Sequence, residues 1–182
     1  MAERAPGSPP VLPPAAGGDC IRVQAGDFDV AAEYAALRRP DAVDARQTGA
    51  VAMFVGLVRD FGDARGVDSI FLEHYPGMTE KALQRLVCEA RQRWPLFAVR
   101  IVHRVGELGM GEQIVFVGVS SAHRDAAFAA CEFLMDYLKT RAPFWKRETA
   151  GGQGRWVEQK ASDVARGQRW EAAGGAEDPP AR

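Results

Sequence analysis

Residues 139–160 concentrate the side chains that could bind an anion and act on it. The stretch carries six basic residues against two acidic ones, and it holds three of the four lysines of the chain, with aromatic residues between the charges. A cluster of cations favours the neutral amine of any one lysine, which prepares that amine for proton transfer or nucleophilic attack. The six cations are Lys139, Arg141, Lys146, Arg147, Arg155 and Lys160.

Further cations stand at positions that favour ligand contact. His123 and Arg124 fall in the first turn of an expected helix, where free backbone N–H groups attract anions. Arg59 directly follows an expected buried strand, at the start of a polar loop. Simpler explanations stay open, since Lys139 and Arg141 would also complement the negative end of a helix. Arg59 by itself would equally be a surface residue.

Histidines and cysteines do not form a pattern typical of metal or sulfur chemistry. The three histidines lack the spacing of a zinc site, and the three cysteines include no CxxC pair. Cys88 and Cys131 fall on apolar helix faces, so we expect them to pack in the core. Ser121 is expected to cap a helix, and no P-loop or dinucleotide fingerprint is present. We therefore expect neither a metal nor a cofactor.

Composition indicates one globular domain. The chain has 182 residues, 47% of them hydrophobic, and a formal net charge of −1, which argues against a bulk nucleic-acid binder. No apolar run approaches the roughly 20 residues of a membrane span, and we see no signal peptide. Residues 1–18 and 171–182 are rich in Pro, Ala and Gly, so we expect disordered tails around a single domain at 19–170. The expected compartment is a reducing cytoplasm.

Apolar periodicity predicts strands alternating with helices. Asp29, Thr79 and Ser121 are expected to cap the helices, and residues 106–111 to form a turn. The expected fold class is α/β, in the form of an α+β sandwich with a mixed sheet and helices packed on it. Expected helices cover residues 30–38, 79–94 and 122–140, and expected strands cover 20–24, 48–58, 67–75, 97–105, 113–120, 144–149 and 155–159.

From these residues alone, the ligand is an anion whose class stays open. A phosphate-bearing small molecule, an acidic peptide end and nucleic acid all fit a site built from lysines and arginines. The residues do not specify a reaction.

The chain resembles the large, catalytic subunits of molybdopterin synthases over about residues 20–160. The strand ending GLVRD (56–60) is also similar to a segment of that family. The amino-terminal tail and the carboxy-terminal tail both lie outside the resemblance. The matching segments are EHYPGMTEKAL (73–83), RWP (93–95), HRVGEL (103–108), EQIVFVGVSSAHR (112–124), MDYLKTRAPFWKRE (135–148) and RWVE (155–158).

This resemblance implies a hammerhead-like fold and a sulfur transferase that converts cyclic pyranopterin monophosphate to molybdopterin. It implies that the sulfur arrives as a thiocarboxylate on the C-terminal Gly-Gly of a small ubiquitin-like partner subunit. It also implies a homodimer of large subunits within a heterotetramer. No cysteine is required, because the partner carries the sulfur, and neither nucleic acid nor a membrane is an expected partner.

The resemblance also implies roles for individual residues. Lys139 would lie beside the thiocarboxylate, and Lys146 would assist with substrate and charge. His123 and Arg124 would reach the pocket across the dimer interface. Further pocket residues implied by the match are Arg59, Phe54 and Met135. Arg141 and Arg147 are expected as substrate contacts on charge grounds only. Lys160, at a position where relatives can carry Arg, is expected as a further substrate contact.

Two other classes compete with the synthase subunit. One is a binding module whose basic stretch holds nucleic acid or an acidic protein, which the net charge of −1 disfavours. The other is a paralogue that keeps the dimer and has lost catalysis, which the presence of both lysines disfavours.

Overall fold

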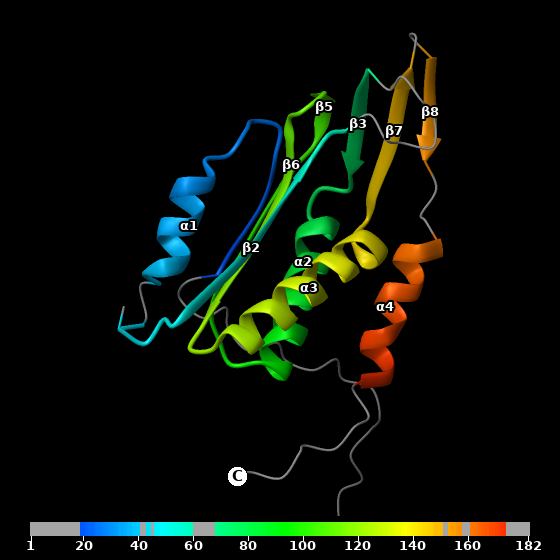
Figure 1. Cartoon of the computed structure of the whole chain (residues 1–182). Helices are drawn as coiled ribbons and strands as arrows, with labels where there is room; N and C mark the ends of the chain where they lie inside the picture. Colours follow the sequence, from blue (N-terminus) through cyan, green and yellow to red (C-terminus); the bar gives the residue numbers. More distant parts are fainter. Residues whose placement is uncertain are drawn as a thin grey trace, which may run out of the picture.

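In the part of the chain that the structure describes, the strands form two four-stranded sheets (Figure 1). This computed structural model describes residues 19–40, 43–44, 46–59, 68–150, 153–157 and 161–173. Sheet A has the order β1 (Cys20–Gln24), β4 (Leu96–Arg104), β6 (Gln113–Ser121) and β2 (Ala50–Leu57). Sheet B has the order β5 (Gly106–Gly109), β3 (Ser69–His74), β7 (Phe144–Ala150) and β8 (Gln153–Val157).

Sheet A is mixed, because β1 runs parallel to β4 while the other neighbours are antiparallel. All pairings in sheet B are antiparallel. The expected α+β class with a mixed sheet is therefore confirmed, with the addition of a second, antiparallel sheet.

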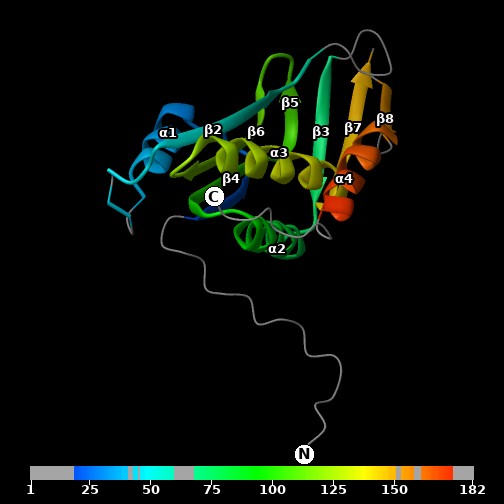
Figure 2. The ribbon, with the colours of Figure 1, turned by 60° about the horizontal axis from the view of Figure 1, so that its bottom comes forward.

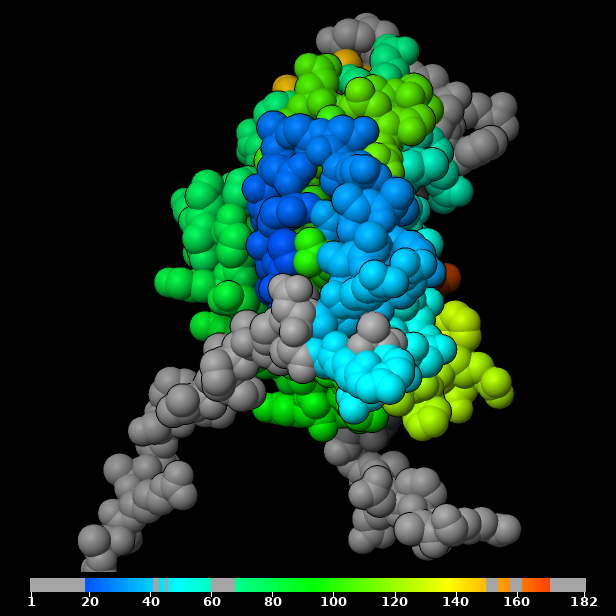
Figure 3. Space-filling view, turned by 90° about the vertical axis from the view of Figure 1, so that its left-hand side faces the viewer, coloured from blue at the N-terminus to red at the C-terminus, as the bar shows by residue number. Residues whose placement is uncertain are grey.

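Helices cover both faces of sheet A. Side chains alternate along β4, so that Val99 and Ile101 join the core with α2 (Met78–Arg93) and α3 (Arg124–Arg141), while Ala98 and Val102 face α1 (Val30–Arg38). On β6, Gly118 allows α1 to approach, since a Cβ there would lie 2.4 Å from Leu37 Cδ1. Figure 3 shows α1 covering its face of the molecule.

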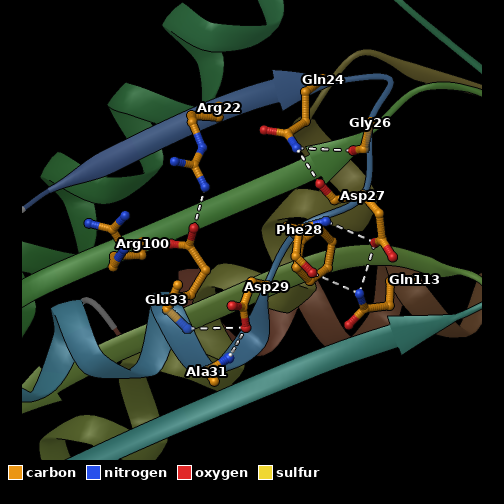
Figure 4. A network of polar contacts seen from close by, with 11 residues as sticks. Arg22, Gln24, Gly26, Asp27, Phe28, Asp29, Ala31, Glu33, Arg100 and Gln113 are labelled. Carbon is orange, nitrogen blue, oxygen red and sulfur yellow. Dashed lines mark hydrogen bonds and ion pairs between the residues drawn. The ribbon is translucent and has the colours of Figure 1, made fainter.

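Polar contacts fix α1 to the sheet (Figure 4). Asp29 caps the helix as expected, accepting hydrogen bonds from the backbone N–H groups of Ala31 and Ala32. The buried carboxylate of Glu33 pairs with Arg22 and with Arg100, whose Nε lies 2.6 Å away. Because two arginines share this buried carboxylate, its charge is compensated inside the fold.

Sheet B lies at the end of the molecule opposite α1 (Figures 1 and 2). Its inner face carries Ile70, Leu72 and Leu108, which pack with Val58 and Ile114 in a small apolar core. In the pairing of β3 with β7, Leu72 lies opposite Lys146 and Ile70 lies opposite Glu148. The side chains of Lys146 and Glu148 therefore share the inner face of sheet B.

A fourth helix, α4 (Ala161–Ala173), packs against α3 and had no counterpart among the expected elements. Figure 2 shows it beside the C-terminal part of α3. This helix continues past residue 170, at which the domain was expected to end. The expected tails at 1–18 and 174–182 lie outside the described residues, so their disorder stays a prediction.

Three local expectations were wrong. Gly77, with φ of 79°, caps α2 and donates its N–H to Glu80 Oε2, whereas Thr79 lies inside the first turn. His123 is the cap residue of α3, because Ser121 belongs to β6 and donates its hydroxyl to the Pro95 carbonyl. Residues 106–109 form β5, which pairs with β3, so only the end of the expected turn is a turn.

No helix among the described residues is long and apolar enough to cross a membrane. The same residues contain no group of three or more His, Cys, Asp or Glu side chains placed to hold a metal ion.

Candidate functional site

A hollow of about 340 Å³ opens between β2, α3 and α4. Phe54 of β2 and Met135 of α3, both expected as apolar pocket residues, line it together with Lys139. Met135 and Lys139 are four residues apart on α3 and therefore share one face of that helix. The structure thus brings three of the expected site residues together around one cavity.

Lys139 stands in the last turn of α3 with its side chain 49% exposed. Its Nζ lies 3.7 Å from Asp163 Oδ1 of α4. The positive charge also complements the C-terminal end of α3, as the simpler explanation required. The lysine is therefore positioned by two helices at once and remains accessible from the hollow.

Further contacts with α3 hold α4 in place. The buried carboxylate of Asp136 accepts hydrogen bonds from Arg169 Nη2 and Trp170 Nε1, both at 2.8 Å. Arg169 Nη2 also lies 2.6 Å from Glu132 Oε1, and these acidic partners raise the pKa of Arg169 above its ordinary value. The Trp170 ring packs edge-on against Phe133, with centroids 5.6 Å apart.

Lys146 has different surroundings. It lies on β7, and its Nζ donates to Glu148 Oε1 at 2.5 Å. The Glu148 residue is only 6% exposed, whereas the Lys146 side chain is 40% exposed. Lys146 does not line the hollow that contains Lys139. Its charge is held by a buried carboxylate on the inner face of sheet B.

His123 and Arg124 lie at the opposite end of α3 from Lys139. Both are exposed, and the Arg124 guanidinium lies 3.5 Å from the exposed carboxylate of Asp125. In Figure 3 the yellow-green N-terminal part of α3 projects at the surface. At 1.5 Å rise per residue, Arg124 and Lys139 are about 22 Å apart along the helix. One copy of the chain therefore does not bring these residues into one site.

The remaining residues that were expected to contact the substrate include Arg59, Arg141 and Lys160. Arg59 is exposed just beyond the end of β2. The Arg141 guanidinium stacks 3.8 Å from the centre of the Tyr137 ring and pairs with Glu89 of α2 at 3.2 Å, and it does not line the hollow. Lys160 lies outside the described residues.

Cys131 lines the hollow but is buried in the main core, as expected from its place on an apolar helix face. Burial, with a smaller contribution from the negative charge of Glu132, raises the pKa of this thiol to about 11. The thiol is therefore protonated near neutral pH and is a poor nucleophile. Cys88, also expected in the core, is half-buried on α2.

The sequence pattern missed the acidic residues that position the lysines. Asp163 is 24 residues from Lys139 in the chain, and no local pattern connects them. Glu148 could have been found, because residues two apart on a strand share a face, and Lys146 and Glu148 are two apart. Arg166, which lines the hollow from α4, was also missed because no helix was expected there.

Comparisons with known proteins agree with this architecture. The family model described as "MoaE protein" matches residues 23–141. The molybdopterin synthase catalytic subunit of Pseudomonas aeruginosa is 58% identical over 151 residues, covering 83% of this chain and 98% of that protein.

Solved structures give the same result. A molybdopterin biosynthesis MoaE protein from Burkholderia ambifaria superposes with a TM-score of 0.70 at 51% identity, covering 84% of this chain and 98% of that one. The fold also matches that of a chain from the complex of subunits 1 and 2 of the Helicobacter pylori molybdopterin-converting factor. The TM-score is 0.64 at 17% identity, and the match covers 77% of this chain and 91% of that one.

Proposed function

The chain belongs to the MoaE family, the catalytic subunits of molybdopterin synthase, and from this membership we propose how its residues carry out sulfur transfer. The family match covers more than half of the chain, and the chain spans nearly the whole length of its Pseudomonas relative. It is thus an enzyme subunit of molybdenum cofactor biosynthesis.

The proposed reaction converts cyclic pyranopterin monophosphate to molybdopterin. The proposed sulfur donor is the thiocarboxylate on the C-terminal Gly-Gly of a small ubiquitin-like subunit. The observation that carries the proposal is an accessible lysine, Lys139, in a hollow whose one lining cysteine, among the described residues, stays protonated. Sulfur in this arrangement comes from outside the chain, and the Helicobacter complex supports a small-subunit partner.

Both proposed ligands are anions, which explains the use of lysines. In a partly desolvated site, fixed cations stabilise the negative charge that develops during transfer. Lys139 would contact the thiocarboxylate and move protons, and Lys146 would hold charge near the substrate. Phe54 and Met135 would form the apolar wall along which the carrier tail lies.

The remaining site residues fit a homodimer within a heterotetramer. His123 and Arg124 lie too far along α3 to serve the hollow of their own chain, so a second copy would supply them to complete a site. Arg59 is proposed as a further residue of the pocket. In support of such an interface, β2 is an edge strand of sheet A, and it exposes Met53 and Leu57. Arg141 and Lys160 are proposed as further substrate contacts, and the cytoplasm as the compartment.

Reconstitution tests this function. The purified chain is mixed with a thiocarboxylated small subunit and cyclic pyranopterin monophosphate, and molybdopterin is measured by the fluorescence of its oxidised derivative. We expect product only when all three components are present. A partner that binds without giving product would identify an inactive paralogue, and absence of both binding and product would contradict the proposal. Sedimentation of the mixture tests the heterotetramer, which predicts two copies of each subunit.

A further inference from the structure

We propose that Arg166 of α4 is a second anion-binding residue of the Lys139 hollow. Its ligand class is an oxyanion or thio-anion: the carboxylate-type end of the carrier tail or the substrate phosphate. The inference rests on the proposed function for the identity of these ligands. It extends that function to a helix that belongs to none of the motifs used to recognise the family.

Contacts of residues before and after Arg166 on α4 fix the position of this arginine. Asp163 lies three residues before it and Trp170 four residues after it, so all three side chains share one face of α4. Asp163 pairs with Lys139 and Trp170 donates to Asp136, which turns this face toward α3. Arg166 lines the hollow from that face.

Close packing fixes the distance between the two helices. A Cβ at Gly167 would lie 3.3 Å from Thr140 Oγ1, so α4 approaches α3 closely next to Arg166. Arg93 Nη1 additionally donates to the Trp170 carbonyl at 2.9 Å. The backbone next to Arg166 is therefore held close to α3 at Gly167, and farther along α4 it is held by Arg93 of α2.

The charges around the hollow leave Arg166 available for a ligand. The acidic groups of α3 that line the hollow, Glu132 and Asp136, are both engaged by Arg169. The acidic group of α4, Asp163, is engaged by Lys139. Among the described residues Arg166 forms no ion pair, and its side chain is exposed.

The chemistry of arginine suits this position. A guanidinium presents a planar set of donors that binds a carboxylate or phosphate through two parallel hydrogen bonds, and it stays charged at all physiological pH values. Lys139 can exchange protons, whereas Arg166 cannot. Arg166 therefore holds the anion, while Lys139 acts at the reacting atoms.

The test compares three variants in the reconstituted complex. Arg166→Ala removes the charge, and Arg166→Lys keeps the charge without the planar donor set. Arg85→Ala removes an exposed arginine from α2, outside the hollow, as a matched control. Steady-state kinetics give separate KM values for the thiocarboxylated carrier and for cyclic pyranopterin monophosphate. Calorimetry measures the Kd of the carrier in its carboxylate form and the Kd of cyclic pyranopterin monophosphate, and circular dichroism checks the fold.

We expect Arg166→Ala to raise one KM by about five- to thirty-fold, as the loss of a charge-assisted contact predicts, with kcat within about two-fold of wild type. A rise in the carrier KM assigns the carrier tail as ligand, and a rise in the pterin KM assigns the substrate phosphate. Arg166→Lys should recover part of the loss, and Arg85→Ala should match wild type.

Unchanged KM values in Arg166→Ala, or an equal rise in Arg85→Ala, would overturn the inference. If the wild-type complex yields no product, the proposed function fails on its own. The Kd values of the carrier and of cyclic pyranopterin monophosphate then test Arg166. A weakening of either Kd by at least five-fold in Arg166→Ala keeps the inference, and two unchanged Kd values remove it. If Arg166→Ala does not fold, Arg166→Gln replaces it in both measurements.

Discussion

The surroundings of Lys139 and Lys146 differ in how each charge is compensated. Lys139 projects from the end of a helix into a hollow, with a carboxylate of another helix 3.7 Å away. Lys146 lies on a strand, 2.5 Å from a carboxylate that is almost fully buried. An anion can approach Lys139 from the hollow, because the lysine side chain is 49% exposed there. Removing Lys146 from Glu148 would leave a buried charge uncompensated.

Under the proposed function, this difference separates a lysine that acts on the ligand from a lysine that a buried carboxylate holds in place. Lys139 can change its partner during a reaction, whereas Lys146 is tied to the stability of sheet B. A loss of activity therefore has different meanings at the two positions, and stability must be measured together with turnover.

The largest effect is expected for Lys139→Ala. Under the proposed function Lys139 contacts the thiocarboxylate, so removing this cation should reduce product formation by at least about 100-fold. The pair with Asp163 joins a half-exposed lysine to a carboxylate that is 20% exposed, so the free energy of unfolding should fall by about 1 kcal/mol. Turnover close to wild type in the reconstituted assay would remove Lys139 from the mechanism.

Lys146→Ala should affect both activity and folding. We expect product formation to fall about ten- to 100-fold, and the free energy of unfolding to fall by about 1–3 kcal/mol, because Glu148 keeps a buried charge without its partner. Denaturant titration measures the stability and the fluorescence assay measures the turnover.

A double variant distinguishes the two effects. Lys146→Met combined with Glu148→Leu removes both charges and should restore stability without restoring activity. A Lys146→Ala protein as stable as Lys139→Ala would show that the buried carboxylate does not distinguish the two lysines.

Acid should weaken the fold next to β7, where His103 stacks on Phe144 with ring centroids 3.8 Å apart. The pKa of His103 is lowered from 6.5 to about 4, mainly by burial. The hydrogen bond to the Arg104 carbonyl opposes this shift, and the nearby His74 contributes a smaller lowering. Between these pH values the unfolded chain binds a proton that the folded chain excludes. The free energy of unfolding should therefore fall by up to about 3 kcal/mol as the pH drops from 6.5 to 4.

Chemical denaturation at several pH values measures this slope. In His103→Gln, which removes the titrating ring, the decline over the same interval should become shallower. An unchanged slope would show that His103 does not contribute to acid sensitivity.

The smallest effect is expected for Cys131→Ala, even though this residue lines the same hollow as Lys139. With a pKa of about 11, roughly one thiol in a thousand is ionised at pH 8, so alkylation should be slow in the folded protein. Turnover should stay within about three-fold of wild type. A loss comparable to that of Lys139→Ala would indicate a protein-bound sulfur intermediate.

The sequence predicted the elements with strong periodicity and missed those that depend on distant partners. The apolar stripe of α3 and the Asp29 cap of α1 are local signals, and both were confirmed. Helix α4 has a polar sequence with a central glycine, and its contacts come from Arg169 and Trp170 reaching α3. No pattern within α4 reveals those contacts.

The candidate site divides in the same way. Residue types and the family resemblance placed Phe54, Met135 and Lys139 around one hollow, as the structure has them. The Asp163 partner of Lys139 required three-dimensional information, whereas the Glu148 partner of Lys146 could be predicted from the spacing of two residues on a strand. His123 and Arg124 lie outside this hollow in a single chain, so their proposed roles depend on assembly. Arg59 and Arg141 also do not line the hollow, and Lys160 falls outside the described residues.

The parallel pairing of β1 with β4 has a consequence for synthesis on the ribosome. Cys20 pairs with Arg100, and Asp19 receives hydrogen bonds from Arg91 and from the Val99 backbone. At about 5–20 residues per second, β1 leaves the ribosome roughly 4–16 s before its partner strand exists. Nascent chains arrested before residue 96 should therefore remain open to protease cleavage at β1, and sheet A completes only when the second half of the chain is made.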